Sequence, residues 1–251
     1  MSIEKSFDNI SKPLVSPEDA FDRKEKLADI CIVTFSLAVY ENVLKSFTCT
    51  QVCYTGTANG KIPVYRIEAH NILFYMSPIG ASVAGMTIDE IRCATGCTKF
   101  IFFGSCGVID REKCDGKIIV PTYAYRDEGF SYHFKESSDY IEIRNSSKLA
   151  MILEELNVDY VTGRTWTTDA FYRETVNNRD ARKKEGCICV EMECSALQSV
   201  CDYRNIELYQ FLFGGDLLTD SSWEKRTLGT ADEKKDQIAS FNLALKIAEK
   251  I

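Results

Sequence analysis

Two acidic residues flank a methionine where an apolar run gives way to a helical pattern. The segment at 190–193 reads Val-Glu-Met-Glu, and alternation along an extended chain points Glu191 and Glu193 to the same side. Carboxylates accept hydrogen bonds from vicinal hydroxyls, such as those of a pentose, and the Met192 thioether offers an adaptable apolar surface. From the residues alone, a second interpretation stays open, in which Glu193 caps the following helix.

A third acidic residue follows another apolar run. Asp216 comes after the apolar residues 211–213 and two glycines, at 214 and 215. Partial burial raises the pKa of a carboxyl, which suits such a group to hand a proton to a bound ligand. The alternative from the sequence is an aspartate that caps a turn.

Two further segments carry polar or stacking groups. Gly-Ser-Cys-Gly at 104–107 follows an apolar run. Its glycines let the backbone approach a ligand, and the Ser105 hydroxyl joins exposed N–H groups in holding an oxyanion. Phe171 and Tyr172 follow a polar stretch at 167–169, so their rings are candidates for stacking on a base, although aromatic pairs also pack in cores.

The elements that position these residues alternate between short apolar strands and amphipathic helices. Several strand candidates are apolar throughout, which is typical of strands covered on both faces. Helical patterns lie between them, one of them followed by Gly96 as a stop and another preceded by a cap at 145–147. The pattern predicts an α/β fold with a mostly parallel sheet, where ligands bind beyond the carboxyl ends of strands. Strands are expected at 30–34, 64–67, 72–76, 100–103, 118–120, 189–191 and 208–213.

The composition limits the class of protein. The 251 residues suit one large domain, and 45% hydrophobic with 27% charged residues is ordinary for a globular chain. A net charge of −7 argues against nucleic acid and anionic membranes as partners, and no stretch approaches the ~18 apolar residues of a membrane span. Eleven cysteines without a CxxC pair, together with only two histidines, predict reduced thiols in a cytoplasmic protein without a metal site.

Taken in order, four segments resemble the nucleoside phosphorylase-I family, which includes uridine phosphorylases and hexameric purine nucleoside phosphorylases. They are Gly-Ser-Cys-Gly at 104–107, Thr-Asp-Ala-Phe-Tyr at 168–172, Val-Glu-Met-Glu at 190–193 and Gly-Asp at 215–216. The resemblance spans roughly residues 28–250. It implies a phosphorylase/hydrolase-like catalytic domain at 28–251 with a twisted, partly barrelled sheet, on which an N-terminal extension at 1–27 packs. It also implies a homo-oligomer, either a dimer or a trimer of dimers.

The family reaction converts a nucleoside and phosphate into a free base and a pentose 1-phosphate. The resemblance therefore implies nucleoside and phosphate as partners, with phosphate as co-substrate and no organic cofactor. The roles that it implies by position are ribose binding by Glu191, Met192 and Glu193, phosphate binding by Ser105, base binding by Phe171 and Gly107, and general acid catalysis by Asp216.

The chain departs from the family at its phosphate ligands. Phe35 and Val39 stand where the first phosphate loop has a Gly and an Arg, and Phe102 replaces an Arg before the Gly-Ser motif. Phosphate recognition relies on arginine forks and N–H donors, so these losses matter. Thr175 and Asn177 occupy the places nearest to the uracil-reading residues of uridine phosphorylases. Three arginines elsewhere are candidates to replace the lost ones: Arg66, Arg126 and Arg173.

Three functions follow from this pattern. A nucleoside phosphorylase is favoured by the resemblance, and a nucleosidase that uses water is favoured by the missing arginines. A non-catalytic nucleoside-binding protein is the third, and the retention of Glu191, Glu193 and Asp216 weighs against it. Phosphate-independent release of a free base distinguishes the second function from the first.

Overall fold

One mixed β-sheet runs through the computed structural model, which describes residues 2–21, 25–57, 60–220 and 222–251. The strand order is β11-β10-β6-β8-β9-β5-β1-β4-β3-β2, with β7 beside β6. An additional pairing of β10 with β5 closes β10, β6, β8, β9 and β5 into a ring, so the sheet is partly barrelled. The strands are β1 (Ile30–Thr34), β2 (Cys49–Thr57), β3 (Gly60–Ile67), β4 (Ile72–Met76), β5 (Lys99–Val108), β6 (Ile118–Asp127), β7 (Tyr140–Glu142), β8 (Tyr160–Thr168), β9 (Cys187–Glu191), β10 (Glu207–Leu218) and β11 (Trp223–Glu224).

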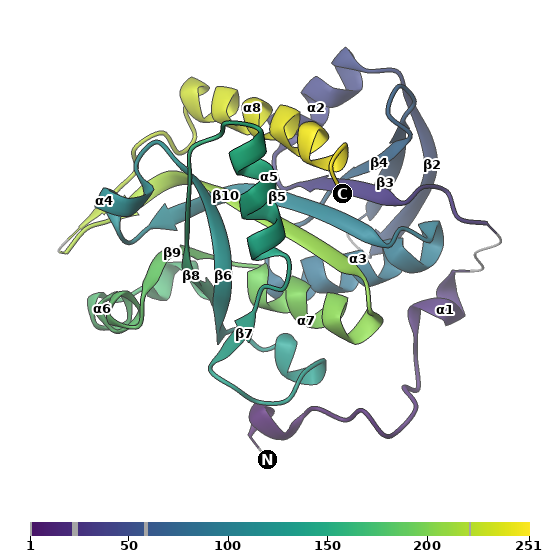
Figure 1. Ribbon diagram of the computed structural model, residues 1–251. Coiled ribbons are helices and arrows are strands. Elements are labelled where there is room, and N and C mark those ends of the chain that lie inside the picture. The colour runs from purple at the N-terminus through teal and green to yellow at the C-terminus, as the bar shows by residue number, and fades with distance from the viewer. Residues whose placement is uncertain (1, 22–24, 58–59, 221) are drawn as a thin grey trace.

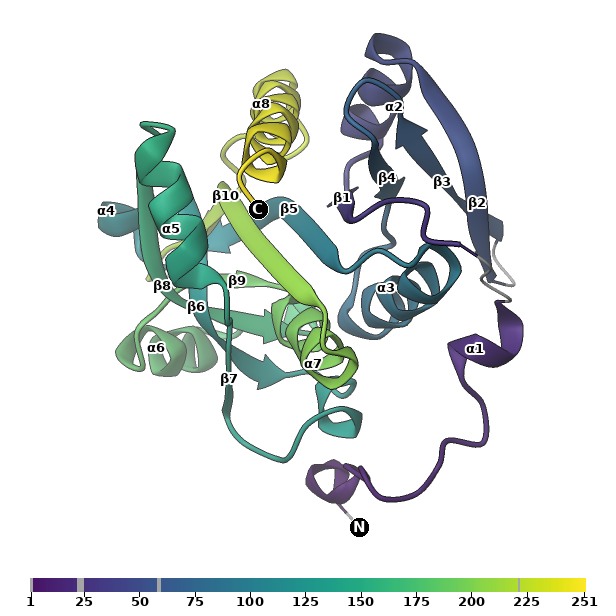
Figure 2. The ribbon, with the colours of Figure 1, turned by 45° about the vertical axis from the view of Figure 1, so that its right-hand side comes forward.

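Helices cover both faces of this sheet (Figures 1 and 2). α2, α5 and α8 lie over one face, and α3 and α7 pack together over the other. The helices are α1 (Pro17–Ala20), α2 (Leu37–Ser46), α3 (Ala81–Thr95), α4 (Arg111–Cys114), α5 (Ser146–Glu155), α6 (Val176–Lys184), α7 (Cys194–Arg204) and α8 (Ala231–Ala248), with 3-10 helices at Ile3–Lys5, Ser131–His133 and Phe171–Arg173.

The core follows from the alternation of side chains along the central strands. In β5, Ile101 and Phe103 join the apolar cluster under α8, where Phe241 also packs. Phe100 and Phe102 point the other way, into the cluster under α3 and α7. The central strands are apolar throughout because they are covered on both faces. The predicted single α/β domain with a helix-flanked, partly barrelled sheet is confirmed.

Several local predictions can be compared with the structure. β1 and β4 have the predicted bounds, and α3 ends at Gly96, whose φ of 73° suits glycine. The predicted cap of α5 is wrong at Asn145, because its side chain makes no capping bond and donates to the Leu208 carbonyl at 3.1 Å. The pairings of β1 with β4 and β5, of β5 with β10, and of β8 with β6 and β9 are parallel. The other pairings, including the short ones of β5 with β9 and of β6 with β10, are antiparallel.

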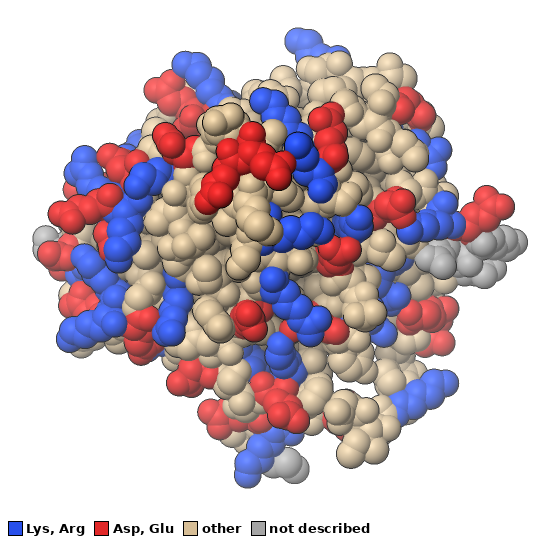
Figure 3. All heavy atoms as spheres, viewed as in Figure 1, with Lys and Arg blue, Asp and Glu red and all other residues tan. Residues whose placement is uncertain are grey.

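The N-terminal segment runs beside α3. α1 contacts α3, and the Glu18 carboxylate pairs with Arg92 at 2.7 Å. Residues 1 and 22–24 of the expected N-terminal extension lie outside the described residues. Acidic and basic side chains are interspersed over the face drawn in Figure 3. Within the described part of the chain, no helix has the length and apolar character needed to cross a membrane.

Candidate active site

Strand pairing brings the predicted segments together. Asp216 on β10 lies in register with Gly107 on β5, which lies in register with Val190 on β9. The polar residues at 104–107 and 215–216 are predicted to follow their strands, and this is wrong, because β5 and β10 continue through them. A register shift in β10 between Gly214 and Asp216 accompanies this continuation.

All seven predicted site residues line one hollow of about 270 Å³, here called the central cavity. The acidic segment after β9 and the acid of β10 therefore face a common space. The predicted residues that line it are Ser105, Gly107, Phe171, Glu191, Met192, Glu193 and Asp216. Sequence reasoning missed others, among them Ile79, Glu174 and Leu228.

Glu191 holds the turn between β9 and α7. Its Oε1 accepts hydrogen bonds from Thr165 at 3.2 Å and Thr167 at 2.5 Å. Its Oε2 accepts from the backbone N–H groups of Glu193 at 2.7 Å and Cys194 at 2.6 Å. Burial raises the pKa of Glu191, and these donors act against that shift. The capping role that the sequence left open for Glu193 therefore falls to Glu191.

Glu193 is the acidic residue that this turn presents to the central cavity. The backbone N–H of Gly80 donates to its Oε1 at 2.6 Å. Gly80 has a φ of 111°, a conformation that favours glycine, and it lies between β4 and α3. Burial, with the nearby charge of Glu191, raises the pKa of Glu193 to about 8. Met192 beside it is half-buried and lines the same cavity.

Asp216 on β10 also lines the central cavity. The carboxyl is buried, and burial raises its pKa, as the sequence predicts. Trp223 Nε1 donates to Asp216 Oδ2 at 2.6 Å and acts in the opposite direction by favouring the charged form. The antiparallel pairing of β10 with β11 brings Trp223 back to this position. Asp216 is thus a carboxyl that holds its proton more tightly than an exposed aspartate does.

Glu174 is an acidic residue of the cavity that the sequence analysis did not select. It follows the 3-10 helix Phe171–Arg173 and lines the cavity beside Phe171 and Asp216. Burial, with the charge of Asp216, raises the pKa of Glu174 to about 8. No periodic pattern marks this loop, so its position after an aromatic pair is the one signal that the sequence offers.

A second, smaller hollow of about 220 Å³, here called the side hollow, adjoins the central cavity. The two share Phe35, Ile79, Gly104, Ser105 and Leu228. Across the described part of the chain, no lysine or arginine lines either space. The polar residues that the side hollow adds are Thr34, Ser36, Glu233 and Gln237.

The arginine candidates for phosphate binding lie elsewhere. Arg66 donates to the Leu27 carbonyl at 3.0 Å, and buried Arg126 donates to Ser131 at 2.8 Å and to nearby carbonyls. Arg173 is exposed and lines neither hollow. Phe35, which the family resemblance implies to be at the phosphate loop, lines both hollows. Its ring would lie 3.2 Å from a Cβ at residue 104.

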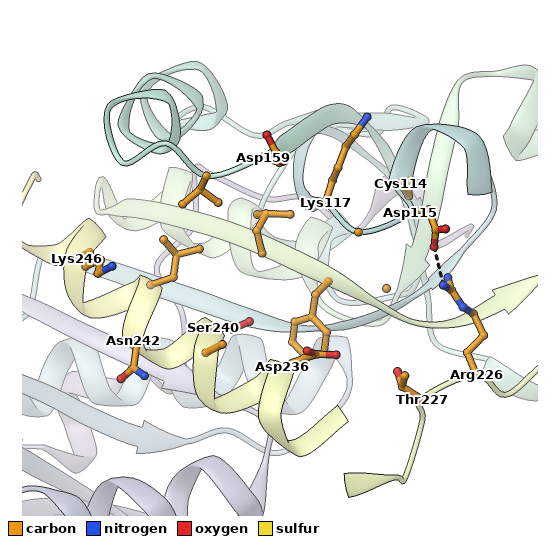
Figure 4. A pocket seen from close by; sticks show the side chains of 17 residues that line it. Cys114, Asp115, Lys117, Asp159, Arg226, Thr227, Asp236, Ser240, Asn242 and Lys246 are labelled. Carbon is orange, nitrogen blue, oxygen red and sulfur yellow. Dashed lines mark hydrogen bonds and ion pairs between the residues drawn. The ribbon is translucent and has the colours of Figure 1, made fainter. Parts of the chain in front are cut away.

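A larger hollow of about 720 Å³, here called the ionic hollow, is a different site (Figure 4). It lies beside α8 and the start of β6, and none of the seven predicted residues lines it. Arg226 pairs there with Asp115 at 2.6 Å, so part of its charge is already compensated. Its other charged residues are Lys117, Asp159, Asp236 and Lys246.

The fold is one that solved nucleoside phosphorylases and nucleosidases share. Residues 29–249 match the Phosphorylase superfamily, and the chain belongs to this superfamily. A DeoD-type purine nucleoside phosphorylase of Aliivibrio fischeri is 26% identical over 177 residues, which cover 69% of this chain and 72% of the relative.

Two solved structures share the fold. The purine nucleoside phosphorylase of Toxoplasma gondii, in complex with immucillin-H, superposes with a TM-score of 0.72 at 19% identity, covering 89% of this chain and 92% of that one. The 5'-methylthioadenosine/S-adenosyl homocysteine nucleosidase of Campylobacter jejuni gives 0.68 at 17% identity, covering 89% and 100%. At these identities the likeness shows the fold alone.

Gly107 permits the close approach of β5, β9 and β10, and its replacement tests that packing. A Cβ there would lie 2.7 Å from Leu218 Cδ1 and 2.9 Å from Val190 Cγ1. We expect Gly107→Ala to lower the free energy of unfolding by about 1–3 kcal/mol, as overpacking does. Gly56→Ala is the matched control, because the nearest atom there is 3.9 Å away. Equal urea midpoints for the two variants would contradict the packing described.

The raised pKa values of Glu174 and Glu193 predict how stability depends on pH. Both values rise from 4.5 to about 8, so the folded chain binds more protons than the unfolded chain between these limits. Their contribution to stability is present below about pH 4.5 and is lost as the pH rises through 8. In urea unfolding at a series of pH values, the free energy of unfolding of Glu193→Gln should decline less than that of the wild type as the pH rises to 8. A decline like that of the exposed-site control Glu249→Gln would refute this.

Proposed function

We propose that this protein cleaves the N-glycosidic bond of a purine or pyrimidine nucleoside. The observation that carries the proposal is that Glu193 and Asp216, which come from different strands' ends, line one cavity. The pentose hydroxyls donate to Glu193 with the sugar against Met192, and the base lies by Phe171 near Asp216. These are the roles that the family resemblance implies for the same residues.

The chemistry of bond cleavage suits these groups. In the transition state, positive charge grows on the pentose and negative charge on the departing base. A carboxylate at the sugar and a proton donor at the base therefore act most strongly in the transition state. Glu191 acts through Glu193 as a positioning residue, because its oxygens accept from the backbone of the turn.

The side hollow favours water as the nucleophile. Phosphate binding needs cationic groups or a cluster of N–H donors, and none of the described residues that line the two spaces is a lysine or arginine. Glu233 adds a carboxyl there, which repels an anion. Hydrolysis gives a free pentose and a free base, and nucleosidase activity is named for the Campylobacter jejuni structure with this fold.

Phosphorolysis is the second candidate. The Ser36 and Ser105 hydroxyls line the side hollow, and Ser36 caps α2, whose N-terminus is a favourable end for an anion. The Aliivibrio fischeri relative is named a phosphorylase, which favours the same reaction. In this case phosphate attacks the pentose, and the product is a pentose 1-phosphate.

One assay separates these functions. The purified protein is incubated with a panel of purine and pyrimidine nucleosides, with and without inorganic phosphate, and the released base and sugar are identified by chromatography. We expect base and free pentose without phosphate. A strict requirement for phosphate would replace hydrolysis with phosphorolysis, and binding without any turnover would support the non-catalytic alternative.

A further inference from the structure

A buried carboxyl without an assigned role faces the side hollow. Glu233 lies in the first turn of α8, and its side chain is 6% exposed. The Gly229 N–H donates to its Oε2 at 2.5 Å, while its own N–H donates to the Thr230 hydroxyl at 3.4 Å. Among the described residues, no group donates to its other oxygen, Oε1. This oxygen is therefore available to a small molecule in the hollow.

The side hollow has the size and polarity for water. Its volume of about 220 Å³ holds several water molecules, each of which occupies about 30 Å³ of the liquid. Ser36 donates to Gln237 Oε1 at 2.5 Å, so the wall next to Glu233 is polar and ordered by its own hydrogen bonds. Ser105 and Gly104 line both this hollow and the central cavity.

We propose that Glu233 is the general base that accepts a proton from the water that attacks the pentose. This inference rests on the proposed hydrolytic function. The water oxygen forms a bond to C1′ of the pentose, and one water proton moves to the Glu233 carboxylate. The bond from C1′ to the base nitrogen breaks, and the base leaves with its electron pair and the Asp216 proton. The products are free pentose and free base.

The other acids of the site already have different positions. Glu193 accepts from Gly80, and Glu174 lines the central cavity beside Phe171, at the end assigned to the base. Neither lines the side hollow. Glu233 is close enough to Asp216 for its charge to help raise the pKa of that carboxyl. A base and an acid thus approach the same bond from adjoining spaces.

Glu233→Gln tests this role and keeps an oxygen that accepts from Gly229. We expect kcat for base release to fall by roughly 10²–10⁴-fold, the usual contribution of a general base, with KM little changed. Asp232→Asn is the matched control, because Asp232 is exposed in the same helical turn and should retain activity.

Azide provides a second readout through Glu233→Ala. Azide attacks C1′ without losing a proton, and removal of the carboxylate lets the anion enter the side hollow. We expect sodium azide to restore base release in this variant and to give a pentosyl azide, with thermal unfolding confirming the fold. Near-normal activity of Glu233→Gln, or a loss in Glu233→Ala that azide does not relieve, would overturn the assignment.

The wild-type protein separates this failure from failure of the proposed function. If the wild type hydrolyses nucleosides and Glu233→Gln does so equally well, only the role of Glu233 is rejected. If the wild type requires phosphate, hydrolysis and its general base are both rejected, but nucleoside cleavage still holds. The absence of any base release from the wild type overturns the proposed function and this inference together.

Discussion

Asp216→Asn is expected to lower kcat for purine nucleosides by roughly 10²–10⁴-fold, because an amide cannot donate the proton that the departing base needs. The native carboxyl is suited to this task, since burial raises its pKa above that of an exposed aspartate. The asparagine keeps an oxygen that can accept from Trp223, so the hairpin of β10 and β11 should persist. Steady-state base release and thermal unfolding measure the two effects.

A change of leaving group isolates the proton transfer. A p-nitrophenyl pentoside releases p-nitrophenolate, a stable anion that needs no protonation, so Asp216→Asn should slow its cleavage much less than that of a purine nucleoside. Asp159→Asn is the control, because Asp159 is an exposed residue at the ionic hollow. Equal losses on both substrates would show that Asp216 does not act as the acid.

Glu193→Gln is expected to lower kcat/KM on the order of 10–100-fold. Hydrogen bonds to charged groups contribute about 1.5–3 kcal/mol, and each 1.4 kcal/mol is a factor of ten in rate. The amide keeps the shape and can still accept from Gly80, but it cannot lose a proton as Glu193 does near pH 8. The loss should therefore be measured at and above pH 8, where Glu193 offers negative charge to the pentose as positive charge develops there.

The stability of this variant separates chemistry from folding. Glutamine buries no titratable group. The free energy of unfolding of Glu193→Gln should therefore be at least that of the wild type near pH 8, where the native carboxyl loses its proton. Glu224→Gln, at an exposed residue of β11, serves as the kinetic control. A normal kcat/KM for Glu193→Gln on the preferred substrate would contradict the role assigned to this residue.

Much of the site was predictable because its residues belong to local motifs on neighbouring strands. Asp216, Gly107 and Val190 lie in register across β10, β5 and β9. The three motifs that contain them are therefore side by side, and their residues line one cavity. Strand alternation does not relate Glu191 to Glu193 as predicted. β9 ends there, and the chain turns so that Glu191 caps the turn while Glu193 accepts from Gly80.

The residues that the sequence did not reveal reach the site through tertiary packing. Gly80 follows a distant strand, Trp223 returns through a hairpin, and Glu233 belongs to a helix cap that has no local link to the motifs. β8 was not predicted either, because Gly163 interrupts its pattern. That glycine is required by packing, since a Cβ there would lie 2.6 Å from Ile188 Cδ1.

Assembly and location stay predictions of the sequence analysis. A dimer or a trimer of dimers is expected from the family resemblance, and sedimentation at several protein concentrations measures it. Cytoplasmic location and phosphate as co-substrate also remain predictions, and the absence of lysine and arginine among the described residues lining the two hollows favours water over phosphate.

The most direct measurement of the central claim is a crystal structure of Asp216→Asn grown with its preferred nucleoside, since this variant should bind substrate without turning it over. We expect the pentose hydroxyls within hydrogen-bond distance of Glu193, the sugar against Met192, and a ring nitrogen of the base facing residue 216. A nucleoside seated in the ionic hollow instead, or one whose pentose lies away from Glu193, would contradict it.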